Sequence, residues 1–253
     1  MATIASGGIA LWAGASLWTF DVPHDPPGRG QTDQHSHHAL QLSLAVAGAF
    51  RLHLPASKMD GPAVLVAPDV AHAFEPRGTV ALLFIEPESP AGRGLLSSLL
   101  KGEPAADVEP SRWRDLAPSL AEAHRSRDRR RLDILGRQLV QRLAAGAAER
   151  PLDRRVARMI DWTGDRMDSP LGIAEAANAI GLSPSRASHL FVEETGLAFR
   201  TYVLWLRLMR AVETYADGGA LTEAAHEAGF ADSAHLSRTF HRIGVPANAL
   251  LLT

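Results

Sequence analysis

IAEAANAIG at Ile173–Gly181 and LTEAAHEAG at Leu221–Gly229 are two copies of one pattern, and they decide the fold of the second half of the chain. In each copy an Ala-rich stretch ends at a glycine, and a second helix-forming stretch follows, with Ser183 or Asp232 at its cap position. Small side chains let two helices approach closely, and glycine permits the left-handed backbone of a tight turn. The repeat therefore predicts two helix-turn-helix units.

The segment between the copies, Ala198–Ala216 (AFRTYVLWLRLMRAVETYA), is apolar on nearly every side. A helix of this kind is buried on most faces, and the two flanking units would bury it. At 1.5 Å per residue it is about 28 Å long, which sets the two second helices close to the roughly 34 Å spacing of successive major grooves of DNA. The outward positions of these second helices predict the DNA-binding residues, which are Ser185, Arg186, Ser188, His189, Ser233, His235, Ser237, Arg238 and Arg242.

Two observations weigh against DNA as the partner. Repeated helix pairs also build solenoids, and residues 151–253 carry 10 basic against 12 acidic side chains. Because phosphate neutralisation supplies most non-specific affinity, DNA-binding domains are usually basic. The presence of only two copies, each with a glycine turn and a capped second helix, still favours DNA, and we expect modest affinity that dimerisation raises.

From about Leu171 to Leu250 the sequence resembles the DNA-binding domain of the AraC/XylS family of bacterial transcription regulators. The resemblance is carried by GLSPSRASHLFVEETGLAFRTYVLWLRLMRA and LTEAAHEAGFADSAHLSRTFHRIGVP. It implies two helix-turn-helix units joined by a long helix, double-stranded DNA as a partner, and RNA polymerase as a further partner. The stretch after Phe240 departs from the family, because HRIGVP is shorter than the usual segment before the Gly and Pro.

Residues 1–90 have the pattern of many short strands. Apolar runs separated by Gly, Pro and Asp occupy Ile9–Trp12, Leu17–Phe20, Leu40–Val46, Phe50–Leu54, Ala63–Val66 and Val80–Ile85. Short strands with frequent turn signals are typical of a β-sandwich or β-barrel. Pro87 and Pro90 end the pattern, and helix-forming residues follow from Leu95.

His35, His37 and Gln41 follow the spacing of the first cupin motif, HxH(X)3E(X)6G, with glutamine in place of glutamate. The second cupin motif is matched loosely by Gly61–Pro68 followed by His72. The front of the chain thus resembles a cupin barrel, which is also the usual sensor module of AraC/XylS regulators. Alternation along a strand would place His35 and His37 on one face, where His72 from a facing strand completes a set of metal ligands.

Two interpretations of these four residues stay open. Cupins that resemble this motif hold a divalent metal through two His, a Glu and a third His, and imidazole sites suit zinc, nickel, copper or iron. Gln41 is a weaker, neutral ligand, so no cofactor is certain. Without a metal, the same residues fit the polar lining of a pocket for a small effector, or plain strand surface.

Residues 91–150 predict helices near Arg112–His124 and Arg129–Ala147. An apolar stripe on the second helix consists of Leu132, Leu135, Leu139 and Leu143. Such a stripe needs a partner surface, and we expect it to dimerise the chain. The basic run Arg125–Arg131 fits a solvated helix start or linker better than a contact with DNA.

The chain of 253 residues contains no cysteine, which excludes disulfide scaffolds, thiol catalysis, iron–sulfur clusters and Cys-ligated zinc. Its apolar runs are well short of the roughly 20 residues of a membrane span. The first arginine is Arg29, so no cationic stretch precedes the first apolar residues. We therefore expect a cytoplasmic protein with no membrane partner.

These patterns together predict an α+β protein of two domains joined by a linker. A cupin-like β-barrel occupies residues 1–90, a helical linker and dimerisation segment 91–150, and an all-α domain with two helix-turn-helix units 151–253. The predicted function is a DNA-binding transcription regulator, not an enzyme, that a small molecule or a metal controls. Two alternatives stay open: a metal-dependent cupin enzyme with an accessory helical domain, and a DNA-binding protein whose barrel only dimerises.

Overall fold

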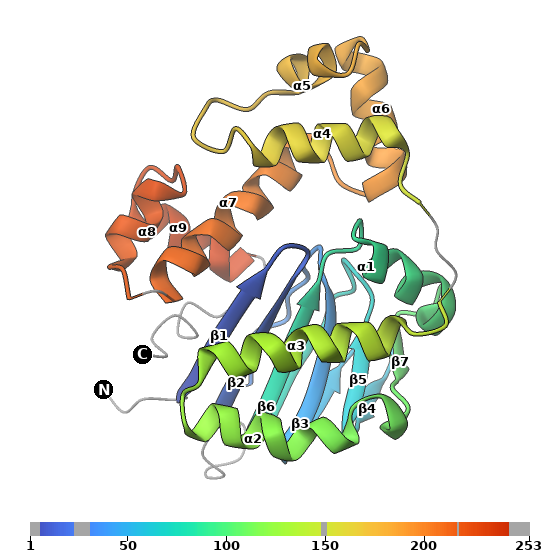
Figure 1. The fold of residues 1–253 in the computed structure, drawn as a ribbon, viewed down its shortest axis with the longest axis vertical. Helices are drawn as coiled ribbons and strands as arrows, with labels where there is room; N and C mark the ends of the chain where they lie inside the picture. The colour runs from blue at the N-terminus through green and yellow to red at the C-terminus, as the bar shows by residue number, and fades with distance from the viewer. Residues whose placement is uncertain (1–5, 23–30, 148–150, 217, 243–253) are drawn as a thin grey trace. The chain divides into compact units, whose positions relative to one another are not determined.

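A computed structural model describes residues 6–22, 31–147, 151–216 and 218–242 of the chain. They form two compact units. Unit 1 takes in the described residues up to 147 and is built around a β-sheet, and unit 2 takes in those from 151 to 240 and is helical (Figure 1). None of the helices in these ranges is both long and apolar enough to cross a lipid bilayer.

Unit 1 contains one antiparallel sheet. Its strands are β1 (Ser6–Trp12), β2 (Ala15–Val22), β3 (Leu40–His53), β4 (Lys58–Asp60), β5 (Ala63–Val66), β6 (Ala73–Ile85) and β7 (Ala105–Asp107). They pair in the order β1-β2-β6-β3-β5-β7, and β4 lies beside the second half of β3. Antiparallel pairing of short apolar runs confirms the β structure that the sequence predicts for the front of the chain.

Strand β3 is longer than the sequence predicts. Two separate strands were expected within residues 40–54, but β3 runs through both of them and stays paired with β6 across one shift in register. Gly48 permits this continuity, because a Cβ atom there would lie 2.1 Å from the carbonyl oxygen of Arg77. Its partner across the sheet is Gly78, with φ of +69°. The paired glycines, which resemble turn signals in the sequence, instead let two long strands bend together.

Helices α2 (Ala117–Arg125) and α3 (Arg129–Ala144) cover one face of this sheet (Figure 1). The α3 leucines expected to form a dimer seam have exposed fractions of 0–6% and belong to one core cluster with strand leucines of the same unit. The prediction that this stripe binds a second copy is therefore wrong. Gly136 lies in the stripe, where a Cβ atom would be 2.4 Å from Cη2 of Trp12, so the helix approaches β1 closely.

The segment predicted as a linker is thus part of unit 1. It begins with α1 (Pro90–Leu95) and a π-helical turn, Leu96–Leu100. The helix predicted from Arg112 to His124 instead starts with two 3₁₀ turns, Pro110–Arg112 and Arg114–Leu116, before α2 begins at Ala117.

Unit 2 has the predicted pair of helix-turn-helix units. Its helices are α4 (Arg154–Gly164), α5 (Ile173–Ala179), α6 (Pro184–Thr195), α7 (Phe199–Ala216), α8 (Leu221–Glu227) and α9 (Ser233–Arg242). The turn between α5 and α6 contains Gly181 with φ of +71°, and the turn between α8 and α9 contains Gly229 with φ of +76°. Helix α7, predicted as a long buried helix, contacts both α6 and α8.

Both predicted helix caps are present. The Ser183 hydroxyl accepts a hydrogen bond from the backbone N–H of Arg186 at 3.3 Å, and Oδ1 of Asp232 accepts one from the backbone N–H of His235 at 2.6 Å. A side-chain cap satisfies a backbone donor that the helix leaves unpaired, and each is worth about 1 kcal/mol. The caps fix where α6 and α9 begin, and so which of their residues face outward.

Candidate effector site and nucleic-acid interface

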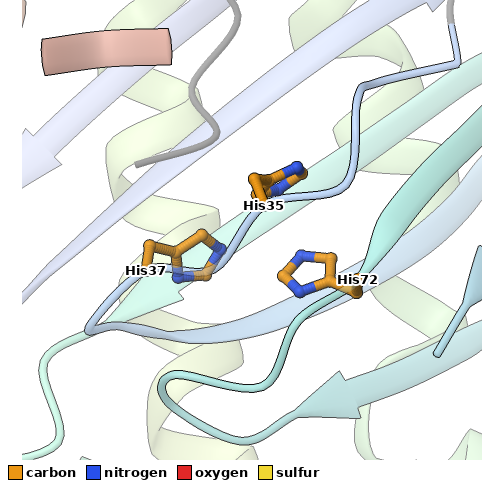
Figure 2. A group of neighbouring side chains, drawn as sticks. All are labelled: His35, His37 and His72. Carbon is orange, nitrogen blue, oxygen red and sulfur yellow. The ribbon is translucent and has the colours of Figure 1, made fainter. Parts of the chain in front are cut away.

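Three histidines of unit 1 converge on one small space. One ring nitrogen from each of His35, His37 and His72 lies within 4.8 Å of the others. Figure 2 shows the three rings turned toward one another. The sequence grouped these residues correctly, but the expectation that they lie on facing strands is wrong. His35 and His72 lie in the segments that lead into β3 and β6, where an isolated antiparallel bridge holds them together.

Gln41, at the start of β3, joins this cluster as predicted. Its Oε1 position lies 2.9 Å from Nε2 of His37 and 3.2 Å from Nε2 of His72. The other end of the amide lies 3.1 Å from the hydroxyl of Ser43. The sequence analysis did not select Ser43, although its spacing of two from Gln41 on a strand places both side chains on one face of the sheet.

Burial keeps these imidazoles neutral at pH 7. Desolvation, with a smaller contribution from the nearby His72, lowers the pKa of His37 to about 3, while the contact with Gln41 opposes the shift. Desolvation also lowers the pKa of His72 to about 4. The pKa of His35 is lowered by burial, with the Asp33 carbonyl and carboxylate acting in the opposite direction. Each ring therefore carries one proton.

The neighbours of each ring decide where that proton lies. Nδ1 of His37 is 2.9 Å from the carbonyl oxygen of Ala39, and Nδ1 of His72 is 2.8 Å from that of Val70. A carbonyl oxygen only accepts hydrogen bonds, so Nδ1 holds the proton in both rings. Nε2 of each ring then carries an unshared electron pair. Gln41 must then direct its two amide N–H groups at these nitrogens, while its oxygen accepts from Ser43.

His35 follows the same rule, because its Nδ1 lies 2.7 Å from the carbonyl oxygen of Asp33. All three Nε2 atoms are thus electron-pair donors. A divalent transition metal fits such a donor set, but ligands about 2.1 Å from a tetrahedral metal are about 3.4 Å apart, so the rings would have to move closer together. A hydroxyl or N–H group of an organic molecule fits as well, whereas a bare carboxylate would face only lone pairs.

A row of aromatic rings continues from the histidines along the sheet. The ring centroid of Phe84 lies 5.2 Å from that of His37 and 5.9 Å from that of Trp18, and Trp18 lies 6.3 Å from Phe20. Because side chains alternate along a strand, this row lies on the sheet face opposite the α3 leucines. The sequence analysis did not select these aromatic residues, although their alternation with the leucines was visible in it.

A buried side-chain contact lies close to this site in the sequence. Nε2 of His38 is 2.8 Å from Oε2 of Glu88, and both side chains are at most 5% exposed. The contact connects the residues just before β3 with those just after β6. Through this contact His38 holds the start of β3 close to the end of β6.

In unit 2, α6 presents the residues that the sequence selected for DNA. Ser185, Arg186 and His189 are exposed, and Ser188 is half-buried. Nδ1 of His189 lies 2.7 Å from the carbonyl oxygen of Ser185, one turn earlier, which holds the ring along the helix surface. The opposite face of α6 is the buried one.

Helix α9 places its selected residues less uniformly. Arg238 is exposed, whereas Ser233, His235 and Ser237 are half-buried. His235 packs edge-on against Phe230 with 5.3 Å between ring centroids, so part of its ring belongs to the turn of the unit. The side chain of Arg242, also selected from the sequence, lies outside the described residues.

Two of the acidic residues that weigh against DNA binding are held by intramolecular contacts. Glu194 accepts a hydrogen bond from the backbone N–H of Asp153 at 3.2 Å, and Glu227 accepts one from the hydroxyl of Thr214 at 2.8 Å. Glu193 is exposed on α6. These hydrogen bonds orient the carboxylates of Glu194 and Glu227 without removing their charge.

Part of the sequence matches known proteins. A family model described as a helix-turn-helix domain matches residues 176–244. The HTH-type transcriptional activator RhaS of Shigella boydii serotype 18 is 29% identical over 114 residues, which cover 44% of this chain and 41% of RhaS. The chain thus matches about two fifths of the length of this relative.

Two solved structures of ToxT from Vibrio cholerae are similar over nearly the whole chain. The apo form has a TM-score of 0.59 at 12% identity, covering 96% of this chain and 99% of ToxT. The form with a bound unsaturated fatty acid has a TM-score of 0.55 at 12% identity, covering 95% of each chain. At this identity the likeness shows a shared fold. The helix-turn-helix match, the similarity to the activator RhaS and the paired helical units agree with the resemblance of this sequence to the AraC/XylS regulators.

Proposed function

We propose that the protein is a DNA-binding transcription regulator in which unit 2 reads DNA and unit 1 binds an effector. The observation that carries the proposal is the pair of capped helix-turn-helix units, in which α6 and α9 present polar side chains outward. The family match and the name of the activator RhaS support it. Such a regulator acts in the cytoplasm as a homodimer, through a surface other than the α3 leucines, and RNA polymerase is its further partner.

The proposed effector is an electron-pair acceptor, because the His35, His37 and His72 cluster has three Nε2 lone pairs, two of which the effector would take over from the Gln41 amide. Two sources supply that chemistry. One is a divalent zinc, nickel, copper or iron ion, with Gln41 or water as a fourth ligand. The other is an aromatic or aliphatic molecule that carries a hydroxyl or N–H group, with its apolar body against Trp18 and Phe84. An unsaturated fatty acid is bound in a ToxT structure, which supports an apolar ligand for a protein of this fold.

Binding of DNA and its control are tested together on the full chain, purified without an affinity tag. DNA sequences are selected from a random pool, and the affinity for the selected DNA is then measured with and without each divalent metal and with any small molecule that native mass spectrometry finds bound. We expect the effector to change the DNA affinity. By linkage, the selected DNA must change the effector affinity by the same factor.

The variant His37→Ala tests the cluster, and His53→Ala is its control for the general loss of a histidine. His53 lies outside the cluster, and its Nε2 is 3.1 Å from Oε2 of Glu75. Only His37→Ala should abolish stoichiometric metal. Less than about a tenth of an equivalent of any transition metal, before and after dialysis against zinc, would reject the metal and leave the organic effector. Failure to enrich any DNA sequence would reject the regulator and return the cupin enzyme alternative.

A further inference from the structure

Helix α6 exposes one large apolar side chain on its outward face. Val192 is 42% exposed, and among the large apolar residues that the structure describes, Ile134 of unit 1 is the other exposed one. The remaining apolar residues of α6, Ala187, Leu190 and Phe191, are at most 4% exposed. Val192 is therefore not part of the core that holds the first helix-turn-helix unit together.

The position of Val192 on the helix puts it among the residues selected for DNA. At 100° per residue, Ser185, Ser188, His189 and Val192 fall within an arc of about 100°. Val192 follows Ser188 by four residues and His189 by three, so it is the next side chain along the same stripe. Any surface that receives Ser188 and His189 also meets Val192.

Chemistry limits what Val192 can recognise in DNA. Its side chain has no hydrogen-bonding atom, so it can bind neither a phosphate nor the polar edge of a base. Glu193 is exposed next to it and would repel a phosphate, so this turn of α6 gains no affinity from the DNA backbone. In the major groove the apolar group that unmodified DNA offers is the C5-methyl of thymine, which only A·T pairs carry.

We propose that Val192 reads a thymine through contact with its C5-methyl group and so determines one position of the DNA sequence that α6 recognises. This inference rests on the proposed DNA-binding function. Ser185, Ser188 and His189 supply the hydrogen bonds of the same helix, while Val192 supplies the apolar contact at its third turn.

The test replaces thymine by uracil, which removes the methyl group and leaves the base-pairing edge intact. Each thymine of the DNA selected by the full chain is replaced in turn, and affinities are measured for the wild type, Val192→Ala, and Ile134→Ala as an exposed apolar control. Burial of one methyl is worth about 0.8 kcal/mol, or about fourfold in affinity. We expect one position where uracil weakens DNA binding by the wild type about fourfold. At that position uracil should cause no further loss of affinity in Val192→Ala.

That coupling identifies the contact, because two changes that remove one interaction are not additive. The control Ile134→Ala should keep the full sensitivity to uracil. If uracil and Val192→Ala weaken binding independently at every thymine, or if no thymine is sensitive, Val192 does not read a methyl group. If Val192→Ala has an altered sedimentation coefficient and an unchanged DNA affinity, Val192 takes part in a protein contact and the inference is overturned. If the wild type selects no DNA at all, the proposed function fails instead.

Discussion

Gln41 contacts two neutral imidazoles and one hydroxyl, all of them buried, and it occupies the position where the cupin motif has a glutamate. An amide can donate to both Nε2 lone pairs when no metal is bound, which a carboxylate cannot do. In the absence of a metal, glutamine therefore satisfies the hydrogen bonds of this cluster better than the glutamate of the usual motif would. Glutamine at this position lowers the affinity for a metal and satisfies the hydrogen bonds of the cluster when no metal is bound.

Gln41→Glu should reverse this exchange. A carboxylate beside His37 and His72 adds an anionic ligand, and we expect the zinc affinity at pH 7 to rise about tenfold or more, since one charge a few ångströms from a cation is worth about 1–4 kcal/mol. A competition titration against a zinc chelator measures this, with Ser43→Ala as the variant that changes the same network without adding charge. Unchanged affinity in Gln41→Glu would mean that the ion, if bound, does not contact this residue.

The unprotonated Nε2 atoms can be observed directly. In the protein treated with a chelator, two-bond ¹⁵N–¹H correlation spectra at pH 7 should show His37 and His72 as neutral rings protonated at Nδ1. The carbonyl oxygens of Ala39 and Val70 enforce that form. Rings protonated at Nε2 would reverse the orientation assigned to Gln41 and remove the argument for an electron-pair acceptor as effector.

Arg238 is the best placed side chain of α9 for reading a base, because it is exposed and a guanidinium can hold O6 and N7 of guanine with two hydrogen bonds. Arg238→Ala should cost about 1–3 kcal/mol on the selected DNA and much less on random DNA. Arg238→Lys keeps the charge and loses the paired hydrogen bonds, so it should retain non-specific binding and lose specificity. Equal losses on both DNAs in a gel-shift titration would reduce Arg238 to a phosphate contact.

At the scale of whole elements, α3 holds unit 1 together. Leu135→Asp combined with Leu139→Asp places two carboxylates against the sheet, and truncation of a buried leucine alone costs about 2–5 kcal/mol. We expect unit 1 to unfold, with the loss followed by chemical denaturation. Ile134→Asp, on the exposed face of the same helix, should change stability by about 0.5 kcal/mol or less. If the double variant stays folded and is monomeric where the wild type is a dimer, the α3 leucines form a dimer interface after all.

How well each element could be predicted depends on how local its causes are. The units α5–α6 and α8–α9 were predictable because their turn glycines and caps lie within a few residues of the helices they shape. The length of β3 was not, since the decisive contact is between Gly48 and the backbone of another strand. The leucines of α3 showed that the helix needs a cover, but an amphipathic pattern does not say which surface supplies it.

The candidate site divides in the same way. Motif spacing was enough to bring His35, His37, Gln41 and His72 together, even though the strands expected to carry the histidines are absent there. The aromatic row beside them was missed, because ring contacts such as that of Phe84 with Trp18 join different strands. Val192 was missed for another reason: in the sequence an apolar helix residue looks like core, and its exposure depends on where the helix packs.

For the whole molecule, the buried histidines make stability depend on pH. The pKa values of His37 and His72, about 3 and about 4, lie below the usual value of about 6.5. Between pH 6.5 and pH 4 the unfolded chain therefore binds more protons than the folded one, so stability is full above pH 6.5 and falls as the pH drops.

In metal-free protein, hydrogen exchange of the β3–β6 amides should thus speed up from pH 7 to pH 5 after correction for the intrinsic rate. Each ring contributes up to about 1.4 kcal/mol per pH unit in this window. His72→Gln should flatten the profile, whereas His189→Gln, exposed on α6, should leave it unchanged. A profile that is as steep in His72→Gln as in the wild type would show that other groups titrate.

The cover that α3 provides for the sheet also determines how this protein can be taken apart and recombined. Since Leu132 through Leu143 cover the leucine face of the sheet, a chimera that grafts only the strands onto a foreign DNA-binding domain would leave that face of the sheet exposed. A portable sensor cassette has to extend to about residue 147, with the splice in the few residues before α4. In a natural gene fusion or an engineered biosensor, the inherited piece would be strands and helices together.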